Sequence, residues 1–216
     1  HNLALAYEAQ GRTVDAAAAW RALLRTRPRT KEVAGLTDAH WAWVRHHTID
    51  LYRQTGEIDA AITLFRQTLK AEPDDADLRL DLAQALLANG QHGAARGEID
   101  RLLRRVPHHV PALLLSADMY AGEGAWYAAE MALREAMEQV PDDVQVRRRL
   151  AAVLVSRGEE LNTSREFKQA VPLLREAVAL DPGNPDHLFS LARCEFNLRD
   201  RKSAEEHLLR GLQVGR

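Results

Sequence analysis

The sequence has few of the residues that build disulfides, sheets and membrane spans. Its one cysteine, Cys194, excludes an internal disulfide and a cysteine-based zinc site. Aromatic residues make up only 6% of the 216 residues, whereas Ala, Leu and Arg are abundant, and this balance favours packed helices over a sheet. No apolar run approaches the ~20 residues that a membrane helix needs. The composition therefore predicts a helical protein with no membrane segment in this chain.

Net charge and catalytic motifs are equally sparse. The 29 Lys and Arg residues nearly balance the 31 Asp and Glu residues, so a net charge of −2 provides no field suited to nucleic acid or an anionic membrane. A glycine-rich phosphate loop, a GxSxG nucleophile elbow and a dinucleotide fingerprint are all missing from the sequence. Cys194 has no histidine at a suitable register and is predicted to fill the core. We expect no cofactor and no catalysis in this chain.

The sequence does contain an internal repeat of 34 residues. Glycines recur with gaps of 45, 34, 34 and 34 at positions 11, 56, 90, 124 and 158, and prolines follow a similar spacing at 28, 73, 107, 141 and 182. Within residues 76–107, apolar positions at helical spacing lie on both sides of Asn89-Gly90, a dipeptide that ends helices. Each unit is therefore predicted to be a helix A, a tight turn and a helix B, which buries its apolar faces by stacking on its neighbours.

Six copies of this pattern resemble the tetratricopeptide repeat. The positions that carry the resemblance are the small residues, the turn glycine and the terminal proline, as in Ala16, Trp20 and Pro28, in Tyr52, Gly56, Ala61, Phe65 and Pro73, and in Leu150, Ala151, Gly158, Ala170, Ala177 and Pro182. The resemblance implies an all-α fold, a right-handed α-solenoid of stacked helix-turn-helix units. It divides a single domain, 1–216, into repeats at about 1–30, 38–75, 76–109, 110–143, 144–184 and 185–216.

Three departures from the pattern carry expectations of their own. Insertions at about 31–41 and 159–166 lengthen two repeats, and the second is expected to extend the hairpin of repeat 5, with Pro172 near the first turn of helix B. Gly35 should break the first insertion, leaving Thr37 or Asp38 as the N-cap of a helix that runs through Thr55. Repeat 6 has Arg199 where the glycine belongs, and the absence of polar capping helices suggests a fragment of a longer protein, with more chain before His1.

In the family, the A helices line a concave groove that binds an extended segment or a helix of a partner. The register of the repeats places the following candidates there: Trp43, His46, His47, Asp50, Asp77, Asp81, Gln84, Asp118, Arg148, Phe189 and Arg193. The middle of the groove is acidic and its C-terminal end is basic, so a partner would place Lys or Arg in the first part and carboxylates in the second. The alternative is that these charges form an ordinary solvated face. The family's clamp for chaperone C-termini is absent as a set, so no such partner is expected.

The stretch HWAWVRHHTID at 40–50 allows two interpretations. His46, His47 and Asp50, together with Asp77 and Asp81 of the next A helix, could surround a metal ion, but the spacing matches no established metal motif. The interpretation that we favour is a polar groove wall in which His46 or His47 pairs with Asp50, with no metal. Trp41 is predicted to lie in the core and Trp43 to be a partly exposed anchor for a ligand.

Four other side chains are predicted to be structural or solvated. Trp20 and Trp126 occupy repeat positions that large packing residues normally fill, and both are interpreted as structural. His108 and His109 stand in a turn between repeats and are expected to face solvent.

These features favour a scaffold that binds a protein or peptide partner in the groove. A self-association module, in which the chain forms a homo-oligomer, and a non-catalytic arm of a larger protein, such as a J-domain co-chaperone, a kinase or a glycosyltransferase, are the alternatives. A metal-dependent hydrolase built on His46, Asp50 and Asp81 is the weakest. The abundance of Ala, Leu and Arg is typical of a GC-rich bacterial genome, and a cytoplasmic location is favoured, although no residue pattern fixes the compartment.

Overall fold

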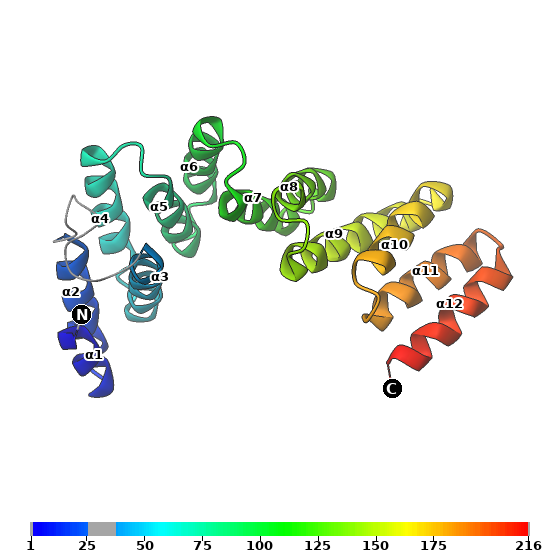
Figure 1. Ribbon diagram of the computed structural model, residues 1–216, viewed down its shortest axis with the longest axis horizontal. Coiled ribbons are helices and arrows are strands. Elements are labelled where there is room, and N and C mark those ends of the chain that lie inside the picture. Colours follow the sequence, from blue (N-terminus) through cyan, green and yellow to red (C-terminus); the bar gives the residue numbers. More distant parts are fainter. Residues whose placement is uncertain (1, 26–37, 216) are drawn as a thin grey trace. The chain divides into compact units, whose positions relative to one another are not determined.

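The computed structural model describes residues 2–25 and 38–215, with the backbone alone at 25, 38–40, 42 and 46. Within these residues the chain forms 12 helices and no strands, and it divides into two compact units, His1–Pro107 and His108–Arg216 (Figure 1). The all-α class and the stacked helix-turn-helix units are confirmed. The boundaries of a single domain and of its six repeats stay a prediction. No helix among the described residues is long and apolar enough to cross a membrane.

The first unit contains three helix pairs, and each helix packs against the next one along the chain. The pairs are α1 (Asn2–Ala9) with α2 (Thr13–Arg25), α3 (Asp38–Thr55) with α4 (Ile58–Ala71), and α5 (Ala76–Ala88) with α6 (His92–Arg105). Contacts of α3 with α5 and of α2 with α4 continue the stack from one A helix to the next and from one B helix to the next. The helix predicted to run through Thr55 is confirmed at that end, whereas Gly35 and Thr37 lie outside the described residues.

The second unit repeats the arrangement with one longer helix. Its pairs are α7 (Val110–Gly122) with α8 (Trp126–Gln139), α9 (Val144–Thr163) with α10 (Phe167–Leu180), and α11 (Pro185–Asn197) with α12 (Arg201–Val214). Helix α9 has 20 residues, whereas α7 and α11 have 13 each, so the seven extra residues lengthen the first helix of this pair. Seven residues are about two helical turns, which extends α9 without rotating its apolar face away from its neighbours.

The turn between the two helices of each pair needs one residue in the left-handed region. Gly90 and Gly124 take it at φ of +74°, as the sequence predicts. The prediction for repeat 5 is wrong, because Gly158 lies inside α9 and the turn falls at Arg165, with φ of +64°. Arg199 takes the same conformation between α11 and α12, at φ of +68°. Two of these turns are therefore built on a residue for which this conformation is strained.

The interior position of Gly158 has a packing reason. A Cβ atom built there would lie 2.7 Å from Cγ of Leu174 on α10, so only a glycine lets α9 and α10 approach this closely. Pro172 is the sixth residue of α10, directly after its first turn, which agrees with the predicted place near that turn. Its missing N–H leaves the carbonyl of Lys168 without its usual helical partner. Pro172 is exposed, which lets water hydrate that carbonyl.

The cores of both units combine larger apolar residues with small residues that recur at one position of the B helices. Ala16, Ala61, Ala95, Ala129 and Ala170 are fully buried, which allows close helix approach at the repeated small positions. Trp20 and Trp41 are buried, as predicted, and Trp126 is half-buried. Cys194 is also buried, which confirms it as a core residue.

Buried charges join successive repeats within each unit. In the first unit, Arg45 of α3 donates to Asp81 of α5, and both side chains are almost completely buried. In the second unit, buried Glu130 of α8 accepts from Arg134 and from Arg157 of α9, and Arg134 also forms a bidentate pair with Glu176 of α10 at 2.7 Å. Hydrogen bonds to Glu176 and Glu130 raise the pKa of Arg134, which favours the charged form of its guanidinium group.

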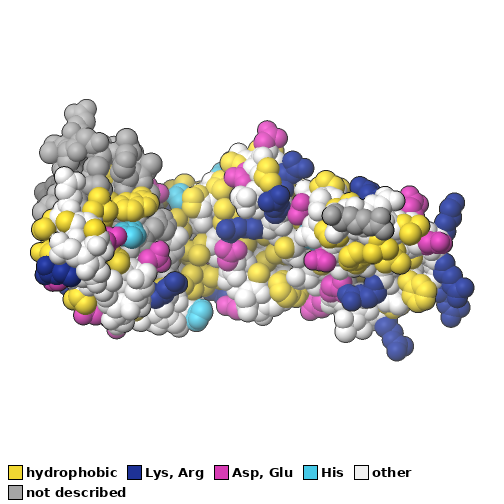
Figure 2. All heavy atoms as spheres, turned by 90° about the horizontal axis from the view of Figure 1, so that it is seen from below, with side chains coloured by type: hydrophobic (Ala, Val, Ile, Leu, Met, Phe, Trp, Pro, Cys, Tyr) yellow, Lys and Arg dark blue, Asp and Glu magenta, His cyan; other side chains and the backbone are white. Residues whose placement is uncertain are grey.

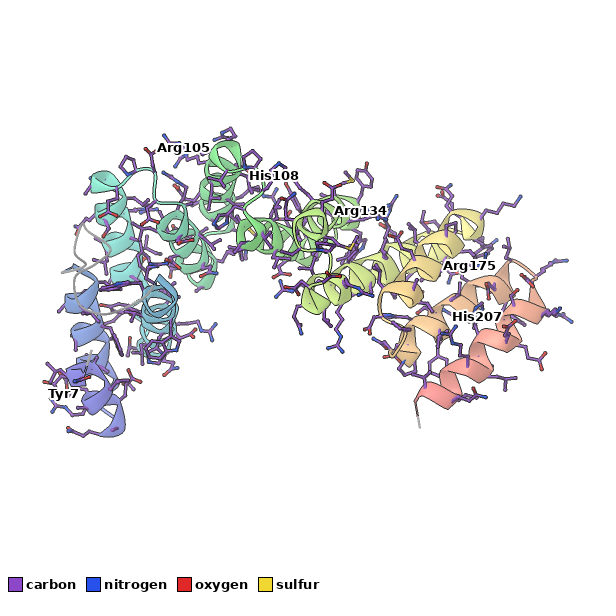
Figure 3. All side chains as sticks on the ribbon, in the orientation of Figure 1. Tyr7, Arg105, His108, Arg134, Arg175 and His207 are labelled. Atoms are coloured by element: carbon purple, nitrogen blue, oxygen red, sulfur yellow. The ribbon has the colours of Figure 1, made fainter. Side chains whose placement is uncertain are left out.

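The last pair of repeats has its own buried carboxylate. Glu195 of α11 is fully buried and accepts from Arg175 of α10 at 3.0 Å, and its other oxygen lies 2.7 Å from Nδ1 of His207 on α12. Figure 3 labels Arg134, Arg175 and His207, and shows that they come from three different helices of this unit. The Glu195 carboxylate thus links α10, α11 and α12.

Aspartate and asparagine side chains begin several helices, and one histidine does so as well. The Asp75, Asp143 and Asp200 carboxylates accept from backbone N–H groups in the first turns of α5, α9 and α12. His109 was predicted to face solvent, but its Nδ1 accepts from the N–H of Ala112 at 3.2 Å and caps α7. His108 is exposed as predicted and lies 3.4 Å from Glu135.

Candidate functional site

The most distinctive surface feature of the first unit is an aromatic cluster formed by its A helices α1 and α3 and by the B helix α2. We use this name for Glu8 of α1, Trp20 of α2, and Trp43 and His47 of α3. The Trp43 ring stacks on the His47 ring, with centroids 4.7 Å apart and planes 11° apart, and the edge of Trp20 meets it at 5.5 Å. Trp43 is 47% exposed, whereas Trp20 is buried. The half-exposed indole of Trp43 is therefore held by ring contacts with His47 on its own helix and with Trp20 on α2.

Glu8 fixes the position of this cluster from the neighbouring A helix. One of its oxygens accepts from Nε1 of Trp20 at 2.5 Å, and the other lies 2.9 Å from Nε2 of His47. Glu8 and His47 are each about one quarter exposed, so this pair is partly shielded from water. Because both oxygens are engaged, the carboxylate orients the two rings that contact Trp43. A ring held in this way offers a rigid apolar surface, which would lose little conformational entropy if a ligand bound to it.

The residues predicted for the groove of the first unit divide into exposed and buried sets. Asp50 and Asp77 are exposed, as a groove position requires. Asp81 is not available to a ligand, because its carboxylate is buried against Arg45. Gln84 is half-buried, and its Oε1 atom is enclosed with no hydrogen-bond partner among the described residues. The side chain of His46 lies outside the described residues.

The predicted pairing of a histidine with Asp50 is wrong for His47. Its Nε2 atom contacts Glu8 of α1 instead, and its ring stacks on that of Trp43, one turn earlier on α3. The metal alternative included His47 and Asp81 among its possible ligands, and these two side chains contact Glu8 of α1 and Arg45 of α3, respectively. Among the described residues there is no group of three or more His, Cys, Asp or Glu side chains that could hold a metal ion.

The charged residues predicted for the groove of the second unit each form an ion pair with another residue of the same unit. Asp118 of α7 accepts from Arg149 of α9 at 2.8 Å, Arg193 of α11 donates to Glu159 of α9, and Arg148 lies 3.9 Å from Asp181. The predicted basic end of the groove is therefore largely neutralised by carboxylates of the same chain. Because most of these side chains are about half exposed, each ion pair contributes little to stability.

Phe189, another predicted groove residue, points toward α12. A Cβ atom at Gly211 would lie 2.5 Å from Cε1 of the Phe189 ring, so the ring occupies the space that the glycine leaves. Phe189 also lines an apolar pocket between α11 and α12. Arg193, which pairs with Glu159, lines the same pocket.

Sequence reasoning missed Glu8, although a signal for it was present. Glu8 stands three residues before Gly11, which is one helical turn after the register position that Asp50, a predicted groove residue, holds six residues before Gly56. The same register therefore places Glu8 on the groove side. It was overlooked because its partners, Trp20 and His47, are 12 and 39 residues away and belong to other helices.

Comparisons with known proteins agree with this architecture. The family profile of the tetratricopeptide repeat matches residues 52–118 and 161–216, and a second profile of the same repeat matches residues 1–30. Solved structures with the same fold include MamA from Desulfovibrio magneticus RS-1, with a TM-score of 0.57 and 17% identity over 81% of this chain and 94% of that one. MamA AMB-1 is similar, with a TM-score of 0.58 and 19% identity over 82% and 93%.

Curated relatives resemble the chain over parts of much longer proteins. Cellulose synthase 1 operon protein C of Komagataeibacter xylinus is 32% identical over 60% of the chain, and cellulose synthase operon protein C of Pseudomonas fluorescens is 37% identical over 38%. The human protein O-mannosyl-transferase TMTC1 is 23% identical over 82%. The chain spans 6%, 10% and 20% of the Pseudomonas, Komagataeibacter and human proteins, respectively. Since the repeat profile covers more than half of its residues, the chain belongs to the tetratricopeptide repeat family.

Proposed function

We propose that this chain is a protein-interaction scaffold, without catalysis of its own, that binds a segment of a partner protein across the A helices of its first unit. The observation that carries the proposal is Trp43, a large aromatic side chain that is 47% exposed and yet held by ring contacts to Trp20 and His47. Tryptophan in such a setting is a frequent centre of binding energy, because it buries a large apolar area while losing little freedom.

The surroundings of Trp43 indicate the chemistry of the partner. Asp50 follows Trp43 by two helical turns on the same face of α3, and Asp77 begins α5 at the repeat position that Trp43 occupies on α3. Both carboxylates are exposed. The partner segment that fits this surface carries an apolar or aromatic side chain for Trp43 and a Lys or Arg for the acidic positions beside it.

The second candidate function is that of a non-catalytic arm in a longer protein. The observation that favours it is the small part, 6–20%, that the chain spans of the curated relatives it matches. Both functions use the same surface, since an arm of this kind acts by binding. They differ in whether the partner domain belongs to the same polypeptide.

Selection from a phage-displayed library of random peptides tests the first proposal. Peptides that bind the chain should combine an aromatic or aliphatic residue with Lys or Arg, and Trp43→Ala should weaken them by about tenfold or more. Tyr127→Ala is the matched control, because Tyr127 is an aromatic side chain on the other unit that is 62% exposed. Circular dichroism confirms that both variants keep their helices. Selected peptides that bind Trp43→Ala as tightly as the unmodified chain would overturn the proposal, and so would a selection that enriches none.

A further inference from the structure

The turns that join α9 to α10 and α11 to α12 carry a group of basic side chains. We call this group the basic edge, and its members are Arg165, Lys168, Arg199, Arg201 and Lys202. All of them are exposed, and none forms an ion pair or a side-chain hydrogen bond with another of the described residues. The two acidic side chains of these turns have local contacts, since Glu166 accepts from Gln169 at 2.6 Å and Asp200 caps α12. Within the described part of the chain, the positive charge of the basic edge is therefore not neutralised by ion pairs.

The turns of the other helix pairs are not basic. Each turn is compared from the residue before the left-handed one to the third residue after it. No Lys or Arg occurs in the turns at 55–59, 89–93 and 123–127. The first turn of the chain contains Arg12, which pairs with Asp15 at 2.8 Å. Since the same positions of the last two turns hold the whole basic edge, its charge is a property of these two turns and not of the repeat pattern.

Two members of the basic edge stand at backbone positions that strain them. Arg165 and Arg199 have φ of +64° and +68°, where the other turns have glycine. Glycine takes this conformation without strain, whereas a residue with a Cβ atom is destabilised by it. Neither guanidinium group gains an ion pair or a hydrogen bond from the described residues that would offset the strain. Strained residues gather at functional sites, and here the strain keeps two exposed charges in the turns.

The long helix α9 carries the basic edge beyond the turn of the preceding pair. Arg157 of α9 lies over the ring of Tyr127, with 5.0 Å to the centroid, and Tyr127 follows the α7–α8 turn directly. From Arg157, α9 continues to Thr163, which is six residues or about 9 Å. The α9–α10 turn therefore projects past the α7–α8 turn. Figure 2 shows Lys and Arg side chains gathered at the outer edge of this unit, where Figure 1 has the α11–α12 turn.

The two basic turns lie next to each other. Nδ2 of Asn197, at the end of α11, donates to Oδ1 of Asn162, near the end of α9, at 3.0 Å. Packed helices are about 8–10 Å apart, so a short anionic chain can contact both turns. Arg165 and Lys168 stay exposed although α11 packs on α9 and α10, because helix pairs stack through their faces and leave the turns at the edge. A further pair stacked on α12 would leave the basic edge open in the same way.

We propose that the basic edge binds an acidic segment of a partner protein, whose Asp and Glu carboxylates pair with the guanidinium and ammonium groups of both turns. An extended segment advances about 3.3 Å per residue, so a run of about four to six residues reaches from one turn to the other. Three of the five basic residues are arginines, whose planar donor groups match carboxylates. The basic edge lies on the other unit from the aromatic cluster, so the inference goes beyond the proposed function and does not rest on it.

The charge of the whole chain favours a short segment over an extended polyanion. The chain has a net charge of −2 although the basic edge is positive, so its remaining residues are negative on balance. At physiological ionic strength, charges act over about 8 Å, and a short segment at the edge therefore meets mainly the five cations. An anionic membrane or a nucleic acid duplex presents its charge over a much larger area and would also approach the acidic remainder.

Fluorescence anisotropy with the whole chain tests this site. The probe is a labelled peptide of about eight alternating Glu and Asp residues, and its control has Gln and Asn instead. Arg165→Gly with Arg199→Gly should weaken binding of the acidic peptide by about tenfold, and this variant should fold well because glycine relieves the strain of both turns. Arg101→Gln with Arg104→Gln, which removes two exposed charges from α6, is the matched control and should bind normally. Trp43→Ala should also bind normally, which separates this site from the aromatic cluster.

Salt and competing anions complete the test. Raising the ionic strength from about 0.1 M to about 1 M shortens the Debye length from about 10 Å to about 3 Å and should abolish binding. Three results would overturn the inference: no binding of the acidic peptide at about 0.1 M, equal binding by the double glycine variant, or equal binding of the Gln and Asn peptide. Tighter binding of phosphatidylserine vesicles or of a duplex oligonucleotide than of the peptide, lost in the double glycine variant, would also overturn it, because it would assign the basic edge to a membrane or to nucleic acid.

Discussion

Replacing Gly158 by alanine reverses the usual effect of a Gly→Ala change in a helix. In a helix interior with free space, alanine stabilises by about 0.5–1 kcal/mol relative to glycine, since the unfolded chain loses freedom and the helix gains propensity. At Gly158 the new Cβ would meet Cγ of Leu174 at 2.7 Å and its Cδ2 at 2.8 Å, in a core where Leu174 is fully buried. Overpacking of this kind costs about 1–3 kcal/mol, which exceeds the gain. We expect Gly158→Ala to lower the free energy of unfolding by about 0.5–2 kcal/mol.

Urea unfolding followed by circular dichroism measures this effect, with Gly97→Ala as the matched control. Gly97 lies inside α6, and a Cβ atom there meets nothing within 4 Å, so this variant should be more stable by about 0.5–1 kcal/mol. Adding Leu174→Ala to Gly158→Ala should remove the cost of the alanine, because the clashing atoms are gone. If Gly158→Ala stabilises the protein as much as Gly97→Ala does, the close contact between α9 and α10 is not as described.

Two further predictions concern strain and burial. Arg199→Gly should raise the free energy of unfolding by about 1 kcal/mol, because glycine accepts a φ of +68° without strain. Arg199→Ala keeps the strained conformation and should not raise it. Equal midpoints of urea unfolding for the two variants would contradict this prediction. The thiol of Cys194 should react with iodoacetamide at least about a hundredfold more slowly in the folded chain than in urea at the same mildly alkaline pH. This ratio corresponds to a free energy of local opening of about 3 kcal/mol. Burial, and then the carboxylates of Glu159 and Glu195, raise its pKa, so the thiolate is disfavoured; mass spectrometry that finds similar rates would refute this.

The repeat pattern made the fold predictable, and the insertions marked where prediction failed. Four of the five turns that join the helix pairs within repeats 1–4 and 6 fall where the 34-residue register places a glycine, and the fifth falls at Arg199, as the sequence indicated. Gly158 misled the prediction because a glycine in register looks the same whether it makes a turn or lets two helices approach. That distinction depends on Leu174, which follows 16 residues later and faces Gly158 only after folding.

The candidate sites were predictable to a lesser degree, because the helix face of a residue says little about its partner. Periodicity separated Trp41, which is buried, from Trp43, which is half-exposed. It also placed Asp81 on the groove side, but a basic residue on the preceding A helix, Arg45, draws this carboxylate into the interior. A pairing between helices 36 residues apart has no signature in one sequence. The pocket between α11 and α12 was missed for the same reason, since it depends on how Phe189 fills the space beside Gly211.

The buried ion pairs favour the correct stacking order of the helices during folding. Repeats with nearly interchangeable apolar faces offer a folding chain many wrong neighbours one register away. Glu195 makes such exchange costly, because the position it holds on α11 is Leu154 on α9, so α11 stacked in place of α9 would bury a carboxylate away from Arg175 and His207. Asp81 pairs with Arg45, and Glu130 pairs with Arg134 and Arg157, so each buried carboxylate has different partners. Each junction thereby carries a charge pattern of its own, which tells otherwise similar helices apart.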